Sequence, residues 1–174
     1  MIGRPGVERA AAAVAVVSLA LWVGGIVALG ACAAPIVFRV VPAPLSGDAM
    51  GSVFRRFDGI AIACGVVVLA CEAIRIRVAA AEGAPTRAAK IAERARTALA
   101  VVASACAIYG GTRISPAIVA LHRAGAVRAF GADGAELERL HALAEAVAKL
   151  EVLAGLFLLV LHVTTLRCVE EKSA

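Results

Sequence analysis

Four titratable side chains with helical spacing lie in the last third of the chain. Glu138, His141, Glu145 and Lys149 follow one another at intervals of three, four and four residues. In an α-helix these intervals place side chains on one face, and Glu145 and Lys149 are spaced to form an i,i+4 ion pair. Such a stripe binds a solute if it faces other helices, and it is solvated if it faces water.

The two orientations predict different surroundings for the stripe. Facing a helix bundle, it joins Asp58 and Arg113 in a polar vestibule that binds or passes a small solute. Facing water, it is the solvated side of a projecting helix, which suits Glu138 and His141 better. For Glu145, Lys149 and Glu151 both orientations remain open, because a charge costs less toward the membrane boundary than at its centre. The candidate ligand-binding residues are therefore Asp58, Arg113, Glu145, Lys149 and Glu151.

Catalytic and metal chemistry find little support in the motifs. Glu138 and His141 match the Glu-x-x-His spacing of di-iron bundles, but a complete site needs two copies and the chain has one. His162 lies near the other end of the same helix and His122 in a connection, which argues against a haem held by two histidines. The GxSxG, Walker and HExxH motifs are absent from the sequence. We predict no catalytic residue, no metal site and no cofactor.

The element that must carry such residues is the membrane-spanning helix. The run from Ala10 to Phe38 contains no Asp, Glu, Lys or Arg, and as a helix it exceeds the ~30 Å hydrocarbon core of a bilayer. The chain is 61% hydrophobic with a mean hydropathy of +0.90. Three weaker apolar runs follow. We predict an all-α, polytopic four-transmembrane-helix bundle, one domain over residues 1–174, with spans near 10–38, 54–76, 97–116 and 146–166.

Two of the later runs are too short to span alone. Gly59–Cys71 and Val152–Leu166 must recruit flanking charges, which brings Asp58, Glu72, Lys149 and Glu151 toward the lipid. Glu72 and Arg75 are one turn apart and allow an intramembrane ion pair. In the third run, Ser115 and Pro116 are expected to interrupt or kink the helix.

The basic residues read as topology signals. The net charge is +5, but Lys and Arg flank apolar runs and are not interleaved with aromatic residues, so we expect the lipid bilayer as partner and no nucleic acid. Ten of them fall on the side of the termini and seven on the other side. This bias predicts a cell (inner) membrane protein with both termini in the cytoplasm. The ten are Arg4, Arg9, Arg75, Arg77, Arg87, Lys90, Arg94, Arg96, Arg167 and Lys172.

Small residues recur every fourth position in the first span, at Ala20, Gly24, Ala28 and Cys32. Such a ladder lets another helix approach closely in lipid, so we expect it to serve helix packing. An alternative role is docking of a second copy or of another membrane protein. Cys32 also ends a segment resembling a lipoprotein cleavage site, but the apolar run is about twice the ~7 to 15 residues of a signal sequence, so we expect no cleavage.

The order of these segments resembles a family of small four-helix bacterial membrane proteins of unknown function, related to eukaryotic transmembrane protein 205. The resemblance rests on the Gly-rich first span ending in residues 34–38, on 51–58 (GSVFRRFD), on 114–121 and on Leu140–His141 before a Leu-rich helix. It implies a compact multi-pass bundle and hints at solute export. It supplies no catalytic residues.

Overall fold

The computed structural model describes residues 4–42, 45–81, 86–128 and 130–165, and the described residues contain helices and no strand. Arg167 and Lys172, which the sequence analysis counts on the side of the termini, lie outside these ranges. The elements in chain order are α1 (Arg4–Val27), the π-helical turn η1 (Ala28–Ala33), α2 (Ala34–Val40), α3 (Leu45–Ala81), α4 (Arg87–Tyr109), the π-helical turn η2 (Gly110–Ile114), α5 (Ser115–Arg123) and α6 (Gly131–Thr164).

Continuous helix joins α1 to α2 and α4 to α5, so the chain forms four long rods. All four are long and apolar enough to cross a membrane. A helix of 37 residues such as α3 is about 55 Å long, well beyond the ~30 Å hydrocarbon core. The rods therefore extend into the headgroup layers, which is why they exceed the spans predicted from hydropathy. The protein is an all-α, multi-pass membrane protein.

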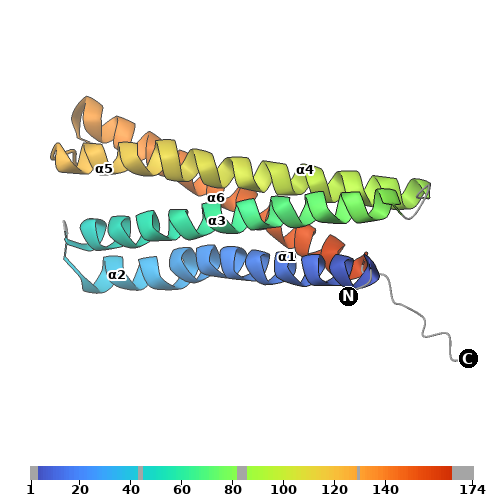
Figure 1. Cartoon of the computed structure of the whole chain (residues 1–174). Helices are drawn as coiled ribbons and strands as arrows, with labels where there is room; N and C mark the ends of the chain where they lie inside the picture. The colour runs from blue at the N-terminus through green and yellow to red at the C-terminus, as the bar shows by residue number, and fades with distance from the viewer. Residues whose placement is uncertain (1–3, 43–44, 82–85, 129, 166–174) are drawn as a thin grey trace, which may run out of the picture.

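The rods run up and down side by side (Figure 1). α1 packs against α3 and α6, and α4 packs against the same two helices. α6 crosses the others obliquely. The start of α1 and the end of α6 lie at one end of the bundle, which we call the terminal end; the α2–α3 and α5–α6 connections lie at the other, the loop end.

Small side chains form most of the bundle core. Ala61, Cys64, Ala100, Ala103 and Ala154 are buried there, and they leave room for larger residues from α1 such as Leu19 and Trp22. Because dispersion between closely packed helices replaces the hydrophobic effect inside a bilayer, this close packing holds the bundle together.

The ladder of small residues faces outward, against expectation. Ala20, Gly24, Ala28 and Cys32 are all exposed, and a Cβ added at Gly24 would meet nothing within 4 Å. The packing side of α1 carries small residues such as Ala12 and Ala15 in its first half and the larger Leu19, Trp22 and Val23 in its second half. Small residues also mark the core side of the partner helix α3.

Each π-helical turn lies directly before a proline. Pro35 and Pro116 each occupy the second position of the helix that follows η1 or η2. Proline lacks an N–H and clashes with the carbonyl four residues earlier, which belongs to the turn in both cases. The wider turn accommodates the ring, so the helix continues to Arg123. The chain therefore stays helical through Ser115 and Pro116, and the expected irregularity takes the form of the π-helical turn before them.

The two prolines also mark an internal repeat. The order long helix, π-helical turn, proline, short helix, connection, long helix occurs twice, with Pro35 and Pro116 81 positions apart. In both halves, a glycine of the second long helix packs on a residue of the neighbouring half. Gly65 of α3 packs on Ser104 of α4, and Gly155 of α6 packs on Val23 of α1. The order of elements is thus that of two successive helical hairpins.

Candidate ligand site

A buried carboxylate lies near the middle of the bundle. Trp22 Nε1 donates a hydrogen bond of 3.0 Å to Glu151 Oε2, joining α1 to α6. Trp22 is 2% exposed and Glu151 7%. Both residues lie near the midpoints of their rods, so this pair is at the depth where a charge is most costly in a membrane.

Asp58 on α3 supplies a second carboxylate close to the first. The two carboxylates are near enough to repel each other. Ser115 is a hydrogen-bond partner of Asp58, while its Oδ2 is buried without a partner among the described residues. Asp58 is therefore only partly satisfied by the protein.

The turn η2 brings these side chains together because it begins with two glycines. A Cβ added at Gly111 would lie 3.0 Å from Asp58 Cβ, and one added at Gly110 would lie 4.0 Å from Glu151 Oε1. A side chain at position 111 would press on Asp58, whereas one at position 110 would only touch Glu151. We call Asp58, Glu151, Trp22 and the glycine pair Gly110–Gly111 the acidic site.

The acidic site has no basic partner in the described part of the chain. Neither Asp58 nor Glu151 takes part in any salt bridge there. By the spacings of the repeat, Glu151 corresponds to Ala61 and Trp22 to Ala103, which are ordinary core residues. What the acidic site adds is negative charge.

A second buried cluster, the ionic network, lies toward the terminal end. Glu72 Oε1 is 3.6 Å from Arg75 Nη1, the i,i+3 pair that the spacing allows. Arg96 Nε lies 3.2 Å from Glu72 Oε2, and its Nη1 donates to Thr165 Oγ1 at 3.1 Å. Arg75 Nη2 is 3.6 Å from Glu8 Oε1. Every rod of the bundle contributes to it.

His162 completes the ionic network. Arg75 Nη1 donates to His162 Nδ1 at 2.7 Å, so the neutral ring carries its proton on Nε2. Nε2 faces Glu72 Oε1 at 3.2 Å, although the angle falls short of a hydrogen bond. Two carboxylates and two guanidinium groups balance each other, so this network needs no ligand.

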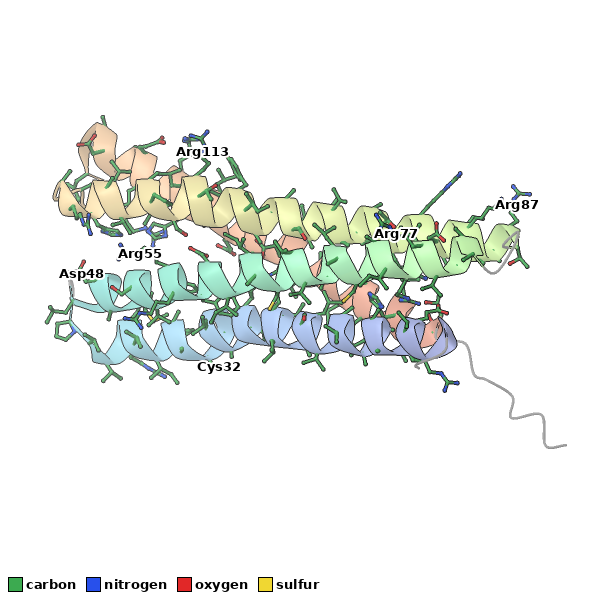
Figure 2. All side chains as sticks on the ribbon, viewed as in Figure 1. Cys32, Asp48, Arg55, Arg77, Arg87 and Arg113 are labelled. Carbon is green, nitrogen blue, oxygen red and sulfur yellow. The ribbon has the colours of Figure 1, made fainter. Side chains whose placement is uncertain are left out.

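Three of the predicted ligand residues lie elsewhere. Glu145 and Lys149 form their i,i+4 pair at 2.7 Å, with both side chains about two-thirds exposed. Arg113 is also exposed and points away from the bundle (Figure 2). The proposed vestibule therefore does not contain these three. Of the five candidates, only Asp58 and Glu151 come together.

Of the remaining two members of the stripe, Glu138 is solvated and His141 is only partly exposed. Glu138 is exposed and paired with Arg128 at 2.8 Å. The His141 ring lies 5.9 Å from that of His122, edge to face. In the described ranges, no three His, Cys, Asp or Glu side chains gather in a way that could hold a metal ion.

Apart from the Glu72–Arg75 pair, the contacts that define the two clusters were not predicted. The sequence indicated Arg96 as a topology signal and assigned no partner to Trp22 or His162. Their partners are 24 to 129 positions away in the chain, so no local spacing indicates them. Trp22 offered one signal, since a buried indole N–H ordinarily has an acceptor.

Comparison with known proteins identifies a family. A domain of unknown function, DUF4149, matches residues 17–126, which is more than half of the chain. The chain belongs to this family. The match runs from α1 through α5 and includes Trp22, Asp58 and the network residues of α3 and α4, whereas α6 of this DUF4149 protein lies outside it. No curated protein and no solved structure matches the chain.

Proposed function

We propose that this DUF4149 protein binds a small monovalent cation, the proton included, at the acidic site and passes it through the bundle. One observation carries the proposal: the buried carboxylate of Glu151 and the half-buried carboxylate of Asp58, from different rods, both lie against η2 and form no salt bridge with any described residue. Ionised groups at this depth need neutralisation, and a bound cation or proton provides it.

The ionic network supports this assignment by contrast. Its charges compensate one another through ion pairs of 3.2 to 3.6 Å. The acidic site is the buried cluster with charge left over. Asp58 is half-buried and lies 13 residues from the start of α3 at the loop end, whereas Glu151 lies 20 residues from the start of α6. We therefore expect a cation to enter from that end.

The chain contains a built-in reporter for this site. Trp22 is the only tryptophan, and its N–H is bonded to Glu151. We expect titration of the purified protein with Na⁺, K⁺ or H⁺ to shift the Trp22 emission, because neutralising Glu151 weakens that hydrogen bond. Glu151→Gln should remove the response. Glu145→Gln, which neutralises an exposed acid on the same helix, is the matched control and should retain it.

Flux provides the second measurement. Proteoliposomes carrying the protein should dissipate an imposed H⁺, Na⁺ or K⁺ gradient faster than empty vesicles. Glu151→Gln and Asp58→Asn should each lower this rate to background. Wild-type flux at background for all three ions, with unchanged Trp22 emission, would refute the proposal.

We propose that the protein lies in the cell (inner) membrane with both termini in the cytoplasm. The excess of Lys and Arg on the terminal side supports this orientation. Reporter fusions active only on one side of the membrane test it. A fusion after Ala81 should report the cytoplasm, and one after Val127 the opposite side.

The exposed ladder favours a second candidate function, that of a membrane assembly subunit. Ala20, Gly24, Ala28 and Cys32 leave a smooth, open face on α1 and η1. We propose a second copy or another membrane protein as its partner. Gly24→Leu should then release the partner in native mass spectrometry, whereas Glu151→Gln should not.

We also infer kinship with the relatives of transmembrane protein 205. The order of the segments at residues 34–38, 51–58 and 114–121 supports it. A comparison of family profiles tests it: the two families should align over these segments in the same order.

A further inference from the structure

A cavity of about 180 Å³ lies at the loop end, apart from the acidic site. Residues of α3 and α5 line it, among them Asp48, Ser52, Arg55, His122 and Arg123. Figure 2 shows Asp48 near the start of α3 and Arg55 between α3 and α5. All the α3 residues that line it fall within about 15 Å of the start of that helix, at the level of the lipid headgroups.

The charge of the lining is positive. Arg55 and Arg123 face one carboxylate, Asp48, and neither arginine forms a salt bridge with any described residue. Both guanidinium groups therefore remain available to a ligand of the opposite charge.

We propose that this cavity binds a phosphate group. Guanidinium groups offer paired N–H donors that match phosphate oxygens, and the Ser52 hydroxyl and His122 ring add further donors. The volume suffices for a phosphate with a small substituent. Gly51 also lines the cavity, and a Cβ added there would meet nothing within 4 Å, so the α3 backbone stays open to the ligand.

The phosphate can come from a lipid headgroup or from a free phosphate ester. Two measurements separate these sources. Inorganic phosphate and glycerol 3-phosphate are titrated by calorimetry into protein held in phosphatidylcholine nanodiscs, at about 0.15 M salt to screen distant charges. Native mass spectrometry then compares retention of phosphatidic acid with that of phosphatidylcholine.

Arg55→Gln combined with Arg123→Gln should weaken binding of the phosphate probe at least about tenfold, since two charge-assisted contacts are lost. Arg56→Gln is the matched control, because Arg56 is an adjacent exposed arginine that does not line the cavity. It should change binding less than about twofold.

Gly51→Leu tests the cavity without changing charge. It should fill the space and abolish binding, and a leucine favours helix more than glycine does, so folding is retained. The proposal is supported if these variants weaken binding of the soluble probes or of phosphatidic acid. Whichever of the two binds to the wild type identifies the source of the phosphate group. If the double arginine variant and Gly51→Leu both bind the probes and retain phosphatidic acid as wild type does, the proposal is wrong.

Discussion

Glu72 is the carboxylate at the centre of the ionic network. Its carboxylate lies within 3.2 to 3.6 Å of Arg75, Arg96 and His162, and it is 1% exposed. Glu72→Gln keeps the size of the side chain but removes its charge. Arg75 and Arg96 are then buried with Glu8 as the remaining carboxylate, 3.6 Å from Arg75.

The cost follows from these contacts. Polar contacts between helices in lipid contribute about 1 kcal/mol each, so losing three costs about 3 kcal/mol. Breaking a buried ion pair by removing one partner costs about 3 to 5 kcal/mol in soluble proteins. Both routes agree on about 3 kcal/mol, so we expect Glu72→Gln to lower the free energy of unfolding by that amount.

Reversible unfolding in mixed detergent micelles, with helix content followed by circular dichroism, measures this loss. Adding Arg96→Gln restores charge balance, so the double variant should be more stable than the sum of the single losses, by at least about 1 kcal/mol. The exposed acid Glu145 again serves as control. A Glu72→Gln variant that unfolds at the same detergent fraction as Glu145→Gln would refute the structural role of the network.

Two further predictions concern packing and the acidic site. Gly155→Ala places a methyl group against Val23 and should lower the free energy of unfolding by about 1 to 3 kcal/mol in the same assay. Gly24→Ala lies on the open face and should raise the free energy of unfolding by about 0.5 to 1 kcal/mol. Equal effects of the two variants would contradict the assigned helix faces. Trp22→Phe leaves Glu151 Oε2 without its N–H donor and should cost about 1 to 3 kcal/mol, and an unchanged midpoint would show that the bond contributes nothing.

The fold was predictable because lipid imposes a strong constraint. An uncharged run such as Ala10–Phe38 is stable in a bilayer as a spanning helix, and the same reasoning predicted the other three spans. Hydropathy identifies only the part of a helix that lies in the hydrocarbon core, so it did not predict the helical extensions at both ends of each span. The repeat was also missed, because it survives in the placement of Pro35 and Pro116 and in buried contacts more than in residue identity.

The acidic site was half predictable. The short apolar runs drew attention to Asp58 and Glu151, since a span that recruits charge must bury some of it. Helical geometry already separates the others: at about 100° per residue, Lys149 lies about 160° and Glu145 about 120° around α6 from Glu151. Burying Glu151 therefore exposes that pair. Trp22 as the partner of Glu151 depends on tertiary packing, which local spacing does not contain.

The division of the ionic network between the two hairpins has a consequence for biosynthesis. The first hairpin leaves the ribosome with Glu8, Glu72 and Arg75, an excess of one negative charge, and Arg96 of the third rod restores balance. The early intermediate therefore holds a buried charge that the next segment alone can neutralise. Pairing of Arg96 with Glu72 then sets both the partner and the depth of α4 as it inserts. A chain truncated after Ala81 would keep the uncompensated charge and would remain a target for membrane quality control.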